Sequence, residues 1–63
     1  MPVVTISMAA GRTKEQKRIL VEEITGTLTR TLQVPPGMVT ILIHELEREN
    51  IGRSGFLLSD SPP

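Results

Sequence analysis

Apolar and polar side chains alternate at the start of the chain, along PVVTISM at residues 2–8. In an extended chain successive side chains point to opposite faces, so every second residue shares one face. One face of this segment carries Pro2, Val4, Ile6 and Met8. Because β-branched residues also dominate the segment, the pattern predicts a strand over residues 2–8.

A different period governs the next segment, where an apolar residue recurs at every fourth position. The repeat consists of Leu20, Ile24, Leu28 and Leu32. This spacing places an apolar stripe along one side of a helix. Thr13 followed three residues later by Gln16 is a capping-box signature. We therefore predict a helix from about 14 to 32, ended by the turn sequence Pro35-Pro36-Gly37.

Residues 38–46, MVTILIHEL, are almost continuously apolar, which is typical of a strand covered on both faces. A strand, a helix and a second strand joined by short links favour a parallel β-α-β unit with a right-handed crossover. In the tail, about residues 50–63, two glycines flank Arg53-Ser54 and predict a short hairpin, and we expect the SDSPP end to be frayed. The predicted fold class is α/β, with a single domain over residues 1–63.

The length of the chain limits how it can be stabilised. A chain of 63 residues buries only about 60% of its unfolded surface, and such small domains need disulfides, a metal or association. The sequence has no cysteine, one histidine and one aromatic residue, Phe56. A single helix shields one face of two parallel strands and leaves the other face open. We therefore expect a homo-oligomer.

The charges of the chain exclude some classes of partner. Seven basic residues balance seven acidic ones, whereas a nucleic-acid-binding protein typically carries a basic patch. No apolar run approaches the roughly 20 residues of a membrane span, and no signal peptide opens the sequence. We expect a soluble, cytoplasmic protein that binds neither nucleic acid nor membrane.

Most enzyme chemistries find no support in the sequence. There is no cysteine nucleophile, no serine in a GxSxG context and no GxxxxGK phosphate loop. His44 is expected to be a structural histidine on the second strand. Glu45, Glu47 and Glu49 are interpreted as a polar strand edge or a solvated loop.

Pro2 suggests a specific chemistry because it follows the initiator methionine directly. Methionine aminopeptidases remove Met1 when a small residue such as proline follows, and removal would leave a secondary amine at the strand start. A free α-amino group titrates near pH 8, and burial or a nearby arginine lowers its pKa. An amine poised near neutrality is a competent general base. The alternative is an incidental proline, which a strand tolerates at its first residue.

Arg12 stands just before the helix, after Gly11, a residue suited to a turn that needs a positive φ. Free N–H groups and the helix dipole favour an anion at a helix start. A guanidinium there can grip a carboxylate with two hydrogen bonds. A base and a carboxylate-binding group together suggest proton transfer within a small organic acid. The alternative is that Arg12 is a solvated turn residue.

Pro2, the strand VVTISM, the segment GRTKEQK, the VPP turn and the strand VTILIHE together resemble the 4-oxalocrotonate tautomerase family. The similarity extends from Pro2 to about Leu58. It implies a β-α-β subunit that assembles as a hexamer, a trimer of dimers, and needs no cofactor or metal. Family members convert dienols such as 2-hydroxymuconate into conjugated 2-oxo acids. The resemblance implies that Pro2 is the general base and that Arg12, usually from a neighbouring subunit, binds the substrate carboxylate.

The chain departs from the family pattern at two positions. Many members carry a second arginine, which draws electron density from the substrate, where this chain has Thr40. Either another donor replaces it, with Arg53 the nearest candidate in sequence, or activity on the usual diacid is weak. Arg53 also has an ordinary interpretation as a solvated hairpin residue. An aromatic residue that walls the site in well-known members matches Ile51, which keeps an apolar wall and becomes a candidate substrate-binding residue.

Related dehalogenases of the superfamily use an acidic residue to activate water, and Arg53 occupies the matching position here, which disfavours that reaction. The sequence thus predicts a cofactor-independent tautomerase. The alternative is a catalytically idle β-α-β oligomer with a structural or binding role.

Overall fold

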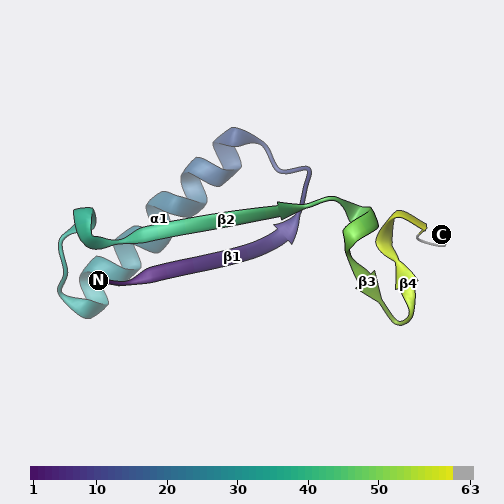
Figure 1. The fold of residues 1–63 in the computed structure, drawn as a ribbon. Coiled ribbons are helices and arrows are strands. Elements are labelled where there is room, and N and C mark those ends of the chain that lie inside the picture. Colours follow the sequence, from purple (N-terminus) through teal and green to yellow (C-terminus); the bar gives the residue numbers. More distant parts are fainter. Residues whose placement is uncertain (61–63) are drawn as a thin grey trace.

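The computed structural model describes residues 1–60. Strand β1 (Val3–Ala9) leads into helix α1 (Lys14–Leu32), and strand β2 (Thr40–Leu46) follows. A small hairpin of strands β3 (Gly52–Arg53) and β4 (Phe56–Leu57) completes the chain, with short 3-10 helices at Pro36–Met38, Arg48–Asn50 and Leu58–Asp60. Figure 1 shows β1 and β2 side by side, α1 across one face of them, and the hairpin projecting beyond the end of β2. The predicted β-α-β unit with a C-terminal hairpin is confirmed.

Strands β1 and β2 are parallel, and their register decides which side chains share a face. Val4 pairs with Ile41 and Ile6 pairs with Ile43. These residues are half-buried, whereas the alternate residues of β1 are exposed. Met8 pairs with Glu45, and the Glu45 carboxylate accepts a hydrogen bond from Lys17 of α1 at 2.5 Å. The face that carries these side chains is therefore the one that α1 covers.

Helix α1 has the predicted bounds because its N-terminus is capped as the sequence indicates. The Gln16 N–H donates to the Thr13 hydroxyl at 3.0 Å, and the Thr13 N–H donates to the Gln16 side-chain oxygen at 2.9 Å. Gly11 has a φ of 127°, a value that L side chains rarely adopt. Its missing side chain allows the chain to turn from β1 into the helix. The capping box and the glycine turn together determine where Arg12 lies.

Three expected strand boundaries differ from the structure by one or two residues, and one of them is the end of β1, which lies at Ala9 and not at Met8. Strand β1 begins at Val3 and not at Pro2, since proline has no N–H for the ladder. Strand β2 begins at Thr40, because the preceding Pro36–Met38 forms a 3-10 turn in which the Met38 N–H donates to the Pro35 carbonyl at 3.0 Å. The expected fraying at the C-terminus is wrong for Ser59 and Asp60, which lie in a 3-10 helix, and the rest of that prediction lies outside the described residues.

The hairpin is tied back to the chain at its base. Both residues of its turn, Ser54 and Gly55, have positive φ, which matches the twist of a tight two-residue hairpin. Gly52 pairs with Leu57, and the Leu58 N–H donates to the Ile51 carbonyl at 2.8 Å. These hydrogen bonds hold Ile51 and the strand that follows it in one arrangement.

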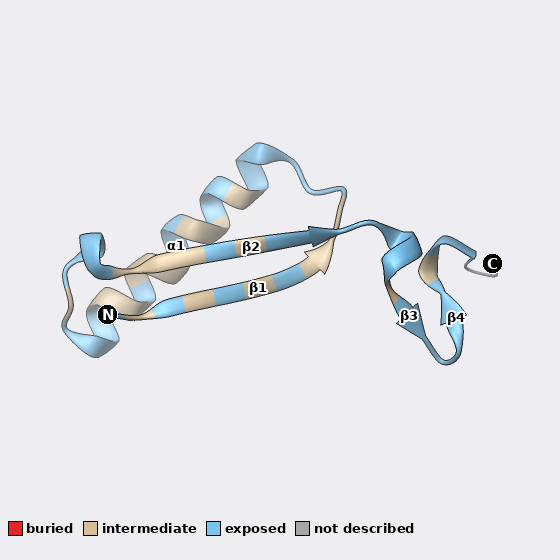
Figure 2. Cartoon of the chain, viewed as in Figure 1, coloured by how far each residue is buried: buried red, intermediate tan, exposed pale blue. Residues whose placement is uncertain are grey.

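A single chain has no buried core among residues 1–60. Figure 2 shows only half-buried and exposed segments, with the two classes alternating along β1. Nine large apolar side chains are exposed: Met1, Val3, Ile19, Leu32, Met38, Leu42, Leu46, Phe56 and Leu57. Three of them, Val3, Leu42 and Leu46, lie on the sheet face opposite α1. No helix in residues 1–60 combines the length and apolar character needed to cross a membrane.

Candidate active site

Pro2 lies at the end of the sheet where both parallel strands begin. It precedes β1 directly and is half-buried. Its carbonyl accepts a hydrogen bond from the Thr40 N–H at 3.1 Å, which fixes the proline backbone beside the start of β2. In the 63-residue chain Met1 is joined to the Pro2 nitrogen, which is therefore a tertiary amide. Only removal of Met1 makes this nitrogen a basic amine.

Arg12 lies at the other end of β1. The Ala10 N–H donates to the Leu46 carbonyl at 2.8 Å and fixes the segment that leads to Arg12 at the carboxyl end of the sheet. The Arg12 side chain is exposed and lines a hollow of about 240 Å³ with Met8, Gln16, Lys17 and Leu20. Within residues 1–60 the ion pairs are Lys17–Glu45 and Arg18–Glu15, so neither involves Arg12. A guanidinium outside these ion pairs, in a hollow with both apolar and polar walls, suits a carboxylate ligand.

The length of β1 separates these two candidate residues. A strand rises about 3.3 Å per residue, so a strand of seven residues spans about 20 Å. Pro2 lies before its first residue, and Arg12 lies three residues beyond its last. No small organic acid bridges that distance. A site that contains both Pro2 and Arg12 therefore needs two copies of the chain.

Ile51 lies at the same end of the sheet as Arg12. It follows the 3-10 helix Arg48–Asn50 and is half-buried. It lines a hollow of about 250 Å³ whose other walls are Ser7, Met8, Ala9, Leu46, Arg53 and Leu58. Met8 lines this hollow and the Arg12 hollow. No pattern in the sequence indicated that Arg53 and the end of β1 line the same hollow, because these residues lie more than 40 positions apart in the chain.

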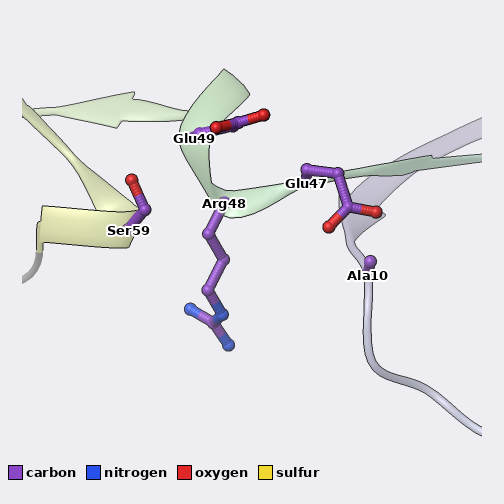
Figure 3. Close-up of a pocket in the computed structure, with 5 residues that line it drawn as sticks. All are labelled: Ala10, Glu47, Arg48, Glu49 and Ser59. Atoms are coloured by element: carbon purple, nitrogen blue, oxygen red, sulfur yellow. The ribbon is translucent and has the colours of Figure 1, made fainter.

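A further hollow of about 410 Å³ lies beside the segment that joins β2 to the hairpin, lined by Ala10, Glu47, Arg48, Glu49 and Ser59. Figure 3 shows the Arg48 side chain extending away from the two carboxylates. None of the predicted site residues lines this hollow. Glu47 and Glu49 are exposed, as expected for a solvated loop, and Glu45 is an exposed residue of β2 that also forms an ion pair with Lys17 of α1. His44 is exposed on the open face of β2, opposite Ser7.

Comparison with known proteins shows the family of the chain. The model of the tautomerase enzyme family matches residues 2–61. The chain is 38% identical over 60 residues to the 2-hydroxymuconate tautomerase of Bacillus subtilis, covering 95% of this chain and 97% of that protein.

Solved structures show the same fold. The crystal structure of a 4-oxalocrotonate tautomerase homologue superimposes with a TM-score of 0.95 at 32% identity and covers 100% of both chains. A heterohexameric 4-oxalocrotonate tautomerase from Chloroflexus aurantiacus has a TM-score of 0.86 at 25% identity and covers 95% of this chain and 97% of that one. This β-α-β fold defines the class of small tautomerases. The chain belongs to the tautomerase family, as an isomerase of the 4-oxalocrotonate tautomerase type.

Proposed function

We propose that the processed protein, with Met1 removed, converts small 2-hydroxydienoates such as 2-hydroxymuconate into their conjugated 2-oxo isomers. The Pro2 amine accepts the proton of the enol hydroxyl and returns it to a carbon of the conjugated chain. Reactant and product are isomers, so the reaction consumes no other reagent. Membership of the tautomerase family and the similarity to a 2-hydroxymuconate tautomerase support this reaction class.

Each group in this proposal has a physical reason for its role. The five-membered ring and the hydrogen bond between the Pro2 carbonyl and the Thr40 N–H restrict the direction of the processed amine. Arg12 of a neighbouring subunit binds the substrate carboxylate and holds the dienol against that amine. Ile51 supplies an apolar wall that shields the reacting chain from water. A positioned base of this kind accelerates a reaction about 10²- to 10⁴-fold.

The observation that carries the proposal is the placement of Pro2 and Arg12 at opposite ends of β1. Copies arranged so that the end of one β1 meets the start of another bring the two residues together. We propose a homohexamer for this assembly. The exposed apolar side chains on the open face of the sheet and on the hairpin support an oligomer, and the heterohexameric relative supports this number of subunits.

Ketonisation of 2-hydroxymuconate and of phenylenolpyruvate, followed in the ultraviolet, tests the proposed activity. We expect the processed protein to accelerate at least one of them above the rate in buffer. The Arg48→Gln variant is a suitable control, because Arg48 is an exposed arginine that lines the hollow in Figure 3 and should leave the rate unchanged. A processed hexamer that accelerates neither reaction would favour the catalytically idle oligomer instead.

A further inference from the structure

The sheet face opposite α1, the open face, carries no fixed charge. Strand pairing and the alternation along each strand place eight residues on it: Val3, Thr5, Ser7, Ala9, Thr40, Leu42, His44 and Leu46. None of the eight is an aspartate, a glutamate, a lysine or an arginine. His44 is the one residue among them whose charge can change near neutral pH. It is exposed, and two exposed leucines, Leu42 and Leu46, flank it along β2.

The acidic residues that follow His44 in the chain lie on other surfaces. Glu45 lies on the α1 side of β2, where its carboxylate accepts a hydrogen bond from Lys17. Glu47 and Glu49 come after the end of β2 and line a separate hollow (Figure 3). Neither ion pair within residues 1–60 includes His44. A positive charge on His44 would therefore have no carboxylate on the open face to balance it.

Arg53 borders the open face at its hairpin end. It lines the hollow of about 250 Å³ that Ser7 and Leu46 also line. Like charges repel, so this arginine, although it is exposed, makes a further positive charge nearby less favourable. The surroundings of the open face thus oppose a positive charge and do not compensate it.

A second copy of the chain is the partner whose chemistry fits the open face. No residue within 1–60 is buried in a single chain, so its apolar side chains need another surface to cover them. Symmetric association brings the same patch of two copies together. A patch without fixed charges allows that contact without repulsion between like charges. Val3 and Leu42, which are 55% and 46% exposed, would pack there.

We propose that His44 makes this assembly sensitive to acid. The neutral imidazole is buried between copies of the chain, and its protonation separates them. The proposal rests on the homo-oligomer of the proposed function. A histidine side chain in water gains a proton at about pH 6.5. Burying an imidazolium ion that has no carboxylate partner is costly. Each copy brings one such charge to the shared contact, so acid should favour separate chains.

Proton linkage sets the direction and the size of the effect. Above about pH 7.5 a histidine is neutral in both states, and association should not depend on pH. Below about pH 6.5 a separate copy binds a proton that an assembled copy excludes, and each such proton weakens association about tenfold for every pH unit. A contact between two copies, with one His44 from each, should therefore weaken by up to about 100-fold per pH unit. Because the proposed site draws Pro2 and Arg12 from different copies, turnover should fall with association.

Sedimentation of the processed protein in a dilution series, at about pH 8 and at about pH 5.5, tests this inference. We expect association of the wild type to be about 10- to 100-fold weaker at the lower pH. His44→Gln keeps a polar side chain of similar size that gains no proton, so its association should differ little between the two pH values. His44→Lys carries a positive charge at both pH values and should associate weakly already at about pH 8.

His44→Thr provides a second neutral variant, because Thr5 and Thr40 already lie on the open face. The inference is overturned if the wild type associates equally at both pH values, or if either neutral variant assembles and then dissociates in acid as the wild type does. Failure of both neutral variants to assemble at about pH 8 would also overturn it, since His44 would then hold the copies together. Tight association of His44→Lys at both pH values would have the same consequence.

Ketonisation separates this inference from the proposed function. Protonation of the Pro2 amine also lowers the rate in acid, but that loss is the same at every protein concentration, whereas the loss through His44 grows on dilution. Acid dissociation that depends on His44, in a protein that accelerates no ketonisation, would support the inference and refute the tautomerase proposal. Ketonisation by a protein whose association does not respond to His44 would refute the inference and leave the tautomerase proposal standing.

Discussion

Retention of Met1 should abolish catalysis while leaving the fold intact. Met1 is 81% exposed, so its packing contributes little to the chain. Pro2 contributes its carbonyl to the hydrogen bond with the Thr40 N–H, and that bond is present with Met1 attached. What Met1 changes is the chemistry and the surroundings of the Pro2 nitrogen, which loses its basic lone pair, and not the fold. Any difference in rate between the two forms therefore reports the state of the site around the Pro2 nitrogen and not the stability of the chain.

The size of the expected loss follows from the role of the base. A positioned general base contributes about 10²- to 10⁴-fold, which corresponds to roughly 3–5.5 kcal/mol in the activation free energy. Met1 in addition occupies space beside the amine. We therefore expect the loss of rate in the Met1-bearing form to reach or exceed the upper end of this range. Pro2→Ala in a processed chain keeps a primary amine on a less rigid terminus and should retain partial activity.

The assay compares the two forms at equal concentration of assembled protein. Mass spectrometry identifies each form, size-exclusion chromatography confirms equal assembly, and ultraviolet absorbance follows ketonisation. For the processed form, kcat/KM should fall as the pH drops through the pKa of the Pro2 amine, because the protonated amine cannot accept a proton. We expect that pKa to lie below the free value of about 8, since partial burial and the arginine of a neighbour disfavour the ammonium form. Equal activity of the two forms would refute the role of Pro2 and the mechanism built on it.

Three other substitutions test separate parts of the structure. Arg12→Ala should cost about 1.5–3 kcal/mol in kcat/KM for a carboxylate substrate with no change in assembly; an unchanged kcat/KM would make Arg12 a solvated turn residue. Leu42→Asp places a charge on the open sheet face, where Leu42 is 46% exposed in one chain. This variant should dissociate the proposed hexamer of roughly 40 kDa at micromolar concentration. Sedimentation that shows an intact hexamer for this variant would contradict the proposed burial of that face. Thr13→Ala removes the hydroxyl that caps α1 and should lower the free energy of unfolding by about 1 kcal/mol in urea titrations at fixed protein concentration; an unchanged midpoint would show that the cap contributes no net stability.

Patterns among neighbouring residues were sufficient to predict the helix and the strands of this protein. Thr13 and Gln16 stand three residues apart and cap each other, so the start of α1 follows from neighbouring residues alone. The positive φ of Gly11 was likewise predictable from its residue type and its place between two elements. The boundaries at Pro2 and Met38 were missed by one or two residues. Apolar side chains continue the strand pattern there, and only hydrogen bonding shows where the ladder ends.

The arrangement of the site depended on contacts between distant parts of the chain. The resemblance implied that Arg12 comes from a neighbouring subunit, and the straight course of β1 supplies a physical reason, because it places Pro2 and Arg12 at opposite ends of the strand. The pairing of Glu45 with Lys17 joins residues 28 positions apart and depends on which face of β2 meets α1. The hollow that Arg53 shares with Met8 depends on how the hairpin folds back beside the end of β1. Such contacts arise from packing and strand register, which act across the folded chain, whereas caps and turns act between neighbours.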